Sequence, residues 1–254
     1  MSNKIIGNPK IVNSEIRFKG KNNILYCEEG ITIKDSYINF EGNNSLIFLS
    51  KNRHIYYFQI TIYHNSVCYF GKNNYSNKKF HIIISEEKNV FIGDECLFAI
   101  DCWIRTADPH IIYNFDKKRI NHSKSVYIGD HVWCGQNVLI FKGSKIGSGC
   151  IVGGGSVVPA KKLFSNSIYA GNPVKLVKSD VFHSKKSVNF FEEDETEKYD
   201  EFIDDRWMYK FDDNTISFDV IEEEITKNKD INYRLNLLKN GLIKSKNRFY
   251  IGNK

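Results

Sequence analysis

The sequence predicts an all-β solenoid in which short parallel strands stack as a β-helix. The main observation is a strict six-residue repeat over residues 128–157, and a glycine follows four of the five residues that open its hexads. A period of six fits neither an amphipathic helix nor an alternating strand, and self-similarity at a fixed period is typical of solenoids. One small or aliphatic side chain per hexad is expected to point into a shared core: Ile128, Cys134, Ile140, Ile146 and Val152.

A second, looser repeat precedes the hexads. The segment IRFKGKNNILYC at 16–27 returns as INFEGNNSLIFL at 38–49, an offset of 22 residues, longer than three hexads. We interpret these segments as coils of the same solenoid with wider corners, marked by Gly-Asn-Asn turns. Residues 16–183 are therefore assigned to the solenoid, and residues 1–15 to a polar lead-in.

The strict hexads begin at Ile92 and are interrupted by residues 105–127, RTADPHIIYNFDKKRINHSKSVY. Ile104 and Ile128 are a multiple of six apart, so the register survives the interruption. A long irregular segment that interrupts a regular scaffold often carries function. This loop contains several groups able to act on a substrate: Asp108, His110, Tyr113, Arg119, Asn121 and His122.

The C-terminal residues 184–254 lose the hexad pattern. They contain a strongly acidic stretch at 192–205 and a predicted helix from about residue 220 to 240, which ends before Gly241. We expect a capping or oligomerisation extension that covers one end of the solenoid, with a substrate-binding domain as the alternative.

The composition of the chain indicates which cellular compartment and which binding partners to expect. The chain of 254 residues has a formal charge of +6 and a pI near 8.8, which favours anionic partners such as an acidic glycan and does not call for nucleic acid. Its six cysteines form no CxxC pair and are interpreted as buried core residues. The N-terminus lacks the apolar core of a signal peptide, and no apolar run approaches the length of a transmembrane helix. We expect a cytoplasmic protein; peripheral membrane contact stays open.

Several motifs of the chain resemble those of the hexapeptide-repeat acyltransferases. These are DPH at 108–110, RINH at 119–122, IGDHVWCG at 128–135 and AGNPVKLV at 170–177. Within that family the chain most resembles the sugar O-acetyltransferases of bacterial capsular polysaccharides, including polysialic acid. The resemblance is specific over residues 88–180 and rests on weaker periodicity over 16–87. It implies a left-handed β-helix, against the usual crossover preference, and homotrimers with acetyl-CoA between neighbouring subunits.

Acetyl transfer to a sugar hydroxyl needs a base, a donor for the oxyanion and a slot for the pantetheine arm. The resemblance implies that His110 is the general base, since a neutral imidazole accepts protons near neutral pH. Trp133 is predicted at an outward corner as a platform for sugar or pantetheine, with subunit packing as the alternative. Asp108 is predicted to orient the imidazole or to contact substrate, and capping of the loop is equally open.

The remaining site residues divide between substrate and cofactor. Arg119 is a candidate partner for a sugar carboxylate or an organiser of the loop that it shares with Tyr113, Asn121 and His122. The resemblance implies cofactor contacts along one coil edge and on a final strand: Gly135, Gln136, Gly154, Ser156, Lys175 and Lys178. Pro159-Ala160 replaces the family's usual Thr-Lys, so Lys161 or Lys162 is predicted to supply that phosphate contact.

We predict an acetyl-CoA-dependent O-acetyltransferase that acts on a hydroxyl of a bacterial surface polysaccharide, of capsule or sialic-acid type, or on its sugar precursor. The acetyl group would be transferred directly in a ternary complex. Alternatives are an N-acetyltransferase for an amino-sugar nucleotide and a non-catalytic structural β-helix. A covalent route is disfavoured because Cys134 should point inward. No metal is expected, since His110, His122 and His131 lack the close pair of a zinc site.

Overall fold

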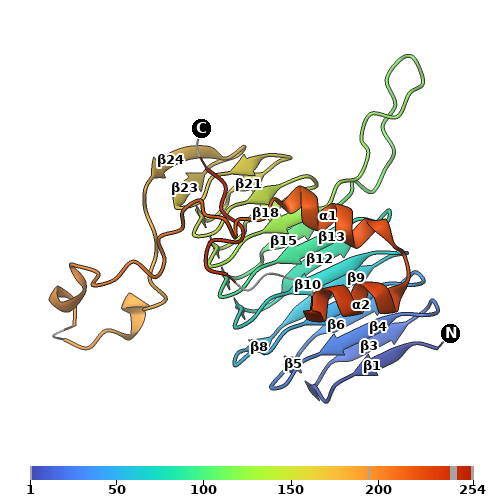
Figure 1. Cartoon of the computed structure of the whole chain (residues 1–254), viewed down its shortest axis with the longest axis horizontal. Coiled ribbons are helices and arrows are strands. Elements are labelled where there is room, and N and C mark those ends of the chain that lie inside the picture. The colour runs from blue at the N-terminus through green and yellow to red at the C-terminus, as the bar shows by residue number, and fades with distance from the viewer. Residues whose placement is uncertain (1, 194, 241–244, 253–254) are drawn as a thin grey trace.

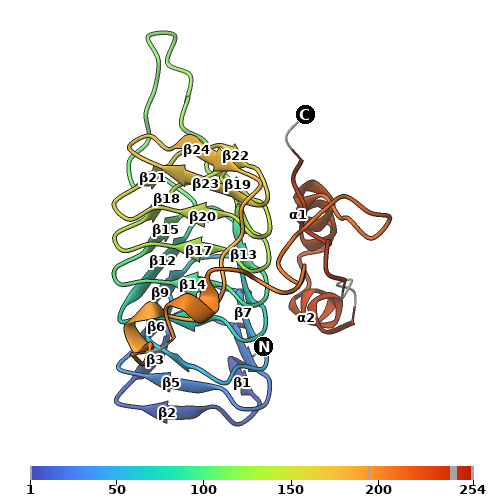
Figure 2. The ribbon, with the colours of Figure 1, turned by 90° about the vertical axis from the view of Figure 1, so that its left-hand side faces the viewer.

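The computed structural model describes residues 2–193, 195–240 and 245–252, and it confirms the predicted solenoid. Parallel strands stack coil upon coil along one axis, and each full coil adds a strand to each of three sides (Figures 1 and 2). We call the eight-stranded side sheet 1. Sheet 2 is the side that begins with three strands and continues with six, and sheet 3 is the seven-stranded side.

The strands of each sheet follow one another along the axis. Sheet 1 contains β1 (Lys4–Ile6), β4 (Ile24–Cys27), β7 (Leu46–Leu49), β10 (Val67–Phe70), β13 (Asn89–Ile92), β16 (Val126–Ile128), β19 (Lys145–Ile146) and β22 (Lys162–Leu163). Sheet 2 contains β2 (Lys10–Val12), β5 (Thr32–Lys34), β8 (Ile55–Tyr56), β11 (Tyr75–Ser76), β14 (Leu97–Phe98), β17 (Trp133–Cys134), β20 (Ile151–Val152), β23 (Ser167–Ala170) and the antiparallel β24 (Lys175–Ser179). Sheet 3 contains β3 (Glu15–Phe18), β6 (Tyr37–Phe40), β9 (Phe58–Ile62), β12 (Phe80–Ile84), β15 (Trp103–Arg105), β18 (Leu139–Ile140) and β21 (Val157–Val158).

The register of the strands confirms both repeats. Ile16 pairs with Ile38, which is the predicted offset of the wide coils, whereas Tyr127 pairs with Lys145 in the tighter hexad coils. The solenoid begins earlier than expected. β1 pairs with β4 and β2 pairs with β5, so residues of the supposed lead-in form strands of the first coil.

The hexad side chains form the core as predicted. The residues that open the five hexads are all completely buried, and all six cysteines are free and buried. Gly135 shows why glycine follows them: a Cβ there would lie 2.6 Å from the backbone N of Gly154 on the next coil. Coils can stack this closely only when the corner lacks a side chain.

The described part of the C-terminal extension contains two α-helices where one helix was predicted. They are α1 (Phe218–Lys227) and α2 (Ile231–Asn240), and the predicted stop, Gly241, lies outside the described residues. The chain breaks between them because Asn228 is extended and Asp230 accepts a hydrogen bond from the Tyr233 backbone N at 2.8 Å. A carboxylate in this position caps the start of a new helix.

Both helices lie along the outer face of sheet 1 (Figure 2), not across an end of the solenoid as expected. That face carries aromatic side chains, including Phe48, Tyr69 and Phe91, which pack with Ile221 of α1 and Leu235 of α2 in a second apolar core. Burying these rings removes a large apolar area from water, which stabilises the helices in this position. None of the described helices is long and apolar enough to cross a membrane.

Candidate active site

The predicted loop leaves the solenoid at the corner between sheets 3 and 1 and projects as a long arm (Figures 1 and 2). We call residues 111–120 the arm. Its two sides pair through an antiparallel bridge between Tyr113 and Arg119, and the Asn114 backbone N donates to the Lys118 carbonyl at 3.0 Å. Its apolar side chains are exposed in the single chain: Ile111, Ile112, Tyr113, Phe115 and Ile120.

His110 lies at the root of the arm, where one buried amide fixes the backbone on both sides of it. The Asn121 Nδ2 donates to the His110 carbonyl at 2.7 Å, and the Asn121 Oδ1 accepts from the Ile112 backbone N at 2.8 Å. The His110 side chain is exposed, and its imidazole forms no hydrogen bond with the described residues. The structure thus presents an accessible imidazole on a fixed backbone.

Asp108 takes part in the same root through an ion pair. Its Oδ2 accepts from the Lys142 Nζ at 2.5 Å and from the Asn121 Nδ2 at 3.0 Å, and Lys142 also donates to the Asn121 carbonyl. The hydrogen bond from Lys142 holds the pKa of Asp108 below its usual range. These contacts match the loop-capping interpretation of Asp108, because its carboxylate is not bonded to the His110 imidazole.

Sequence reasoning missed Lys142. Ile104 pairs with Ile140 across β15 and β18, so Lys142 occupies the corner of the next coil, level with the start of the loop. The hexad register contained this signal, since residues that follow equivalent strands must share a corner. Lys142, Asn121 and Asp108 together form what we call the root network.

Arg119 forms an ion pair within its own chain. Its two terminal nitrogens donate to both carboxylate oxygens of Glu86, at 2.7 and 2.8 Å, and Ser123 also donates to Glu86. The Arg119 side chain lowers the pKa of Glu86 to about 2. Arg119 therefore orders the arm, whereas the predicted contact with a sugar carboxylate would require this pair to open. Tyr113 and His122 are exposed and free to meet a ligand.

Trp133 lies on β17 in sheet 2, away from the corner that carries His110. Its side chain is 42% exposed, and the His183 ring lies 5.7 Å from it. In Figure 2 sheet 2 faces the viewer, whereas the arm rises from the far corner of the solenoid. One chain therefore does not bring the predicted base and the predicted platform together.

The glycine-rich coil edge lies at the corner between sheets 2 and 3. Gln136 and Gly154 are exposed there, and the Gly155 backbone N donates to the Gln136 carbonyl at 2.7 Å. A Cβ added to Gly155 would meet no atom within 4 Å, so the edge is open to a ligand. Ser156 is different: it is buried, and its Oγ accepts from the Gly171 backbone N at 3.1 Å. The Ser156 hydroxyl thus closes the next coil, and the cofactor contact of Ser156 stays a prediction.

The lysines predicted to bind phosphate separate into two groups. Lys175 and Lys178 are exposed on β24, the edge strand of sheet 2. Lys161 lies at the same end of the solenoid, with its Nζ 3.4 Å from the Val174 carbonyl. Lys162 begins β22 in sheet 1, on the side that carries α1, so it does not join the others.

The alternatives that relied on Cys134 and the histidines find no support in this geometry. Cys134 points inward as predicted, and burial raises its pKa well above the usual value. The His131 ring is buried between the rings of His183 and Trp207, with ring centroids 3.9 and 3.6 Å away, so it is not exposed to a ligand from solvent. Among the residues that the structure describes, no three His, Cys, Asp or Glu side chains gather as a metal site would require.

Comparison of sequences identifies relatives of part of the chain. The chain is 34% identical over 104 residues to the polysialic acid O-acetyltransferase of Escherichia coli O1:K1, a match that covers 41% of this chain and 34% of that relative. It is 48% identical over 63 residues to the polysialic acid O-acetyltransferase of Neisseria meningitidis, covering 24% of this chain and 29% of the relative. The matched segment thus spans about a third of the length of these relatives, and no family model matches the chain.

Comparison of folds extends the similarity to about three quarters of the chain. The crystal structure of the polysialic-acid-specific acetyltransferase NeuO aligns with a TM-score of 0.65 at 29% identity, covering 74% of this chain and 91% of that one. The polysialic acid O-acetyltransferase OatWY aligns with a TM-score of 0.64 at 28% identity, covering 75% of this chain and 92% of that one. These matches confirm the left-handed β-helix and the resemblance to acyltransferases that modify sugars.

Proposed function

We propose that this chain, which shares its solenoid with sugar O-acetyltransferases, transfers an acetyl group from acetyl-CoA to a hydroxyl of an anionic bacterial surface polysaccharide or its sugar precursor. The observation that carries the proposal is the exposed imidazole of His110 on a backbone fixed by Asn121. An accessible base held in one place is what direct transfer to a hydroxyl requires.

The open coil edge supports acetyl-CoA as the donor. The pantetheine arm contains two amides, and the exposed backbone at Gln136 and Gly154 offers donors and acceptors that no side chain blocks. Lys175, Lys178 and Lys161 lie at the end of the solenoid where the nucleotide phosphates would bind. Free, buried cysteines agree with a reducing compartment, so we place the reaction in the cytoplasm.

In this mechanism the protein moves one proton. Acetyl-CoA supplies the activated acetyl group as a thioester. The His110 imidazole accepts the proton of the sugar hydroxyl as its oxygen attacks the acetyl carbonyl, and it returns that proton to the departing thiolate. The C–O bond of the ester forms as the C–S bond breaks, and no covalent enzyme intermediate is needed.

The separation of His110 and Trp133 supports a site shared between subunits. The arm leaves at the corner between sheets 3 and 1, whereas Trp133 faces outward from sheet 2. We infer that sheet 2 of one copy faces the arm corner of the next, so that Trp133 and His110 line one cleft. Three such contacts related by rotation close into a trimer.

The experiment compares His110→Ala with the unchanged protein. Thiol released from acetyl-CoA is followed against sialylated, neutral and amino-sugar acceptors. Loss of a general base typically lowers turnover by about 10²–10⁴-fold, and the variant should remain folded and trimeric by circular dichroism and light scattering. Near-full turnover in His110→Ala would remove the proposed base. Transfer only to free amines would favour the N-acetyltransferase alternative, and an intact trimer that neither binds nor uses acetyl-CoA would favour a structural β-helix.

A further inference from the structure

The mechanism above uses no residue of the C-terminal extension, although part of the extension packs on the solenoid. After two short 3₁₀ helices, η1 (Val188–Phe190) and η2 (Glu197–Tyr199), the extension places α1 and α2 on the outer face of sheet 1. In Figure 1, α1 crosses this face close to the point where the loop 105–127 returns to β16. The extension is therefore a neighbour of the loop that carries the proposed base.

One carboxylate of α1 contacts the end of that loop directly. The Glu222 Oε1 accepts a hydrogen bond from the Ser125 Oγ at 2.9 Å, and Ser125 is the last residue before β16. The Glu222 Oε2 accepts from the Asn89 Nδ2 at 3.1 Å and from the Tyr127 hydroxyl. Ser125, Asn89 and Tyr127 are all buried. Because three buried donors converge on one carboxylate, their hydrogen bonds are charge-assisted and fix the end of the loop against α1.

The loop end that Glu222 holds is connected to the backbone of the proposed base. The Lys124 backbone N donates to the Thr106 carbonyl at 3.0 Å, which joins the two ends of the loop. Four residues before Ser125, the Asn121 amide holds the backbone on both sides of His110. A displacement of Ser125 would therefore move the root network.

A second contact between the extension and the loop runs through the turn that joins β12 to β13. Glu86 of this turn accepts hydrogen bonds from Arg119 and Ser123 of the loop. The next residue, Glu87, forms an ion pair at 2.6 Å with Lys229, which lies between α1 and α2. The hydrogen bond from Lys229 holds the pKa of Glu87 below its usual range. One turn thus contacts the loop on one side and the extension on the other.

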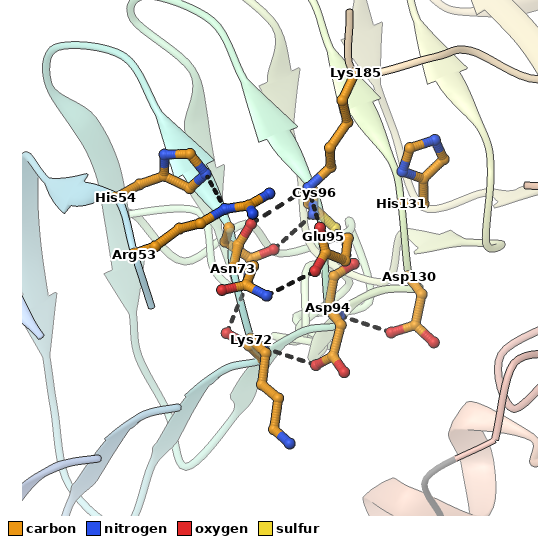
Figure 3. A network of polar contacts seen from close by, with 12 residues as sticks. Arg53, His54, Lys72, Asn73, Asp94, Glu95, Cys96, Asp130, His131 and Lys185 are labelled. Carbon is orange, nitrogen blue, oxygen red and sulfur yellow. Dashed lines mark hydrogen bonds and ion pairs between the residues drawn. The ribbon is translucent and has the colours of Figure 1, made fainter. Parts of the chain in front are cut away.

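The extension is also anchored at the other edge of sheet 1, away from the loop. The Arg248 Nε and Nη2 donate to the two carboxylate oxygens of Asp130 at 2.8 and 2.6 Å, and Nη2 lies 3.0 Å from an Asp94 oxygen. Figure 3 shows Asp94 and Asp130 on neighbouring coils of the corner between sheets 1 and 2, where the Asp94 backbone N donates to Asp130. The Arg248 side chain is 5% exposed, and breaking such a buried pair is costly. Contacts at both edges of sheet 1 therefore hold the extension, and Glu222 with it, in one place.

We propose that α1 positions the loop that carries His110, and that Glu222 is a positioning residue that acts through Ser125. This inference rests on the proposed function, because the group that is positioned is the proposed base. Glu222 takes no part in the chemistry, since it lies on the outer face of sheet 1 and contacts only the end of the loop. The extension thus supports the active site from outside the coils.

The test replaces Glu222 in the full chain with alanine and with glutamine. Glu222→Ala should lower kcat by about tenfold and leave the KM for acetyl-CoA unchanged, because the loop end loses its acceptor while the coil edge at Gln136 stays intact. Glu222→Gln should restore most of the rate. Its Oε1 can accept from Asn89 and Tyr127, and its Nε2 can donate to the Ser125 hydroxyl oxygen.

The matched control is Asp219→Ala on the same helix. Asp219 forms an ion pair with Lys145 on the coil after β16, so its loss loosens the helix but leaves the contact between Glu222 and Ser125. This variant should keep its kcat even where its melting temperature falls. In the double variant of Ser125→Ala with Glu222→Ala, turnover should be no lower than in Ser125→Ala alone, since Glu222 acts through that hydroxyl.

Amide exchange of peptides covering 121–127 gives a measurement that needs no substrate. Exchange there should accelerate in Glu222→Ala and stay unchanged in Glu222→Gln and Asp219→Ala. Full turnover in Glu222→Ala would overturn the inference and leave the proposed function standing. Equal losses of turnover in Glu222→Ala and Asp219→Ala would also overturn it, because they would reflect a general loosening of the helix.

Failure of the proposed function is recognised separately. If the unchanged protein transfers no acetyl group to any acceptor, the function is refuted. Faster exchange at 121–127 that is confined to Glu222→Ala would then still support the hold of α1 on the loop. Unchanged exchange in that variant would overturn the inference as well.

Discussion

Asn121→Ala tests whether the root network positions His110, the proposed base. The side chain of Asn121 is 7% exposed and forms three hydrogen bonds: to the His110 carbonyl at 2.7 Å, from the Ile112 backbone N at 2.8 Å, and to Asp108 at 3.0 Å. Alanine removes all three and leaves the backbone beside His110 without its internal partners. The fold of the coils should survive, because the strands on either side of the loop keep their ladders.

The expected loss of turnover follows from the three hydrogen bonds that the variant lacks. Each contributes about 0.5–1.5 kcal/mol net, so their joint loss weakens the ordered root by about 3 kcal/mol. At about 1.4 kcal/mol per factor of ten, turnover should fall by roughly 10²-fold. The KM for acetyl-CoA should change little, since Gln136 and Gly154 lie at a different corner of the coil.

The assay follows thiol release from acetyl-CoA together with amide exchange of peptides covering 108–122. Exchange in these peptides should accelerate while the melting temperature stays close to that of the unchanged protein. Asn77→Ala is the matched control, because the described contacts of the Asn77 side chain are limited to one hydrogen bond, which its Oδ1 accepts from the Lys78 backbone N in a turn at a different corner from the loop. Full turnover in Asn121→Ala would show that the root network has no part in positioning His110.

Two further predictions concern the scaffold. Burial lowers the pKa of His131 to about 3, whereas the pKa in the unfolded chain is near 6.5, so the stability that the neutral ring provides is complete above pH 6.5 and is lost as the pH falls toward 3. His131→Phe should therefore flatten the pH dependence of the free energy of unfolding over that range. An unchanged slope would show that other groups cause this pH dependence. Gly135→Ala should lower the melting temperature by several degrees, because the new Cβ would lie 2.6 Å from the Gly154 backbone N. Calorimetry that showed an unchanged melting temperature would mean that the two coils move apart without strain.

The coil register could be predicted from sequence because each hexad places one buried side chain and one tight corner. Ile128 and Ile140 are completely buried for the same reason: both begin hexads and both pack against the coil above and below. The wide coils were readable from the offset of 22 residues, which the pairing of Ile60 with Ile82 repeats. The periodic part of the chain thus encodes its own stacking.

The parts that were mispredicted depend on contacts with no period. The aromatic side chains on the outer face of sheet 1 alternate along each strand with side chains that point into the solenoid core, and this alternation does not reveal whether water or a helix covers the outer face. Glu222 of α1 illustrates the difficulty: it accepts hydrogen bonds from Ser125 and Asn89, which lie 97 and 133 residues earlier in the chain. The role of Arg119 was undecided for the same reason, since its partner Glu86 belongs to a different coil.

The corner that carries the arm also has a consequence for how such chains diversify. β13 and β16 stay in register although 36 residues separate Ile92 from Ile128, so the extra residues leave the ladder of strands unbroken. Lengthening a flexible loop costs only about 0.6 kcal/mol for each doubling of its length. The corner can therefore accept inserted segments of different length and chemistry while the coils of the solenoid stay the same. Under the proposed function, exchange of the segment at this corner would change the acceptor without a new fold.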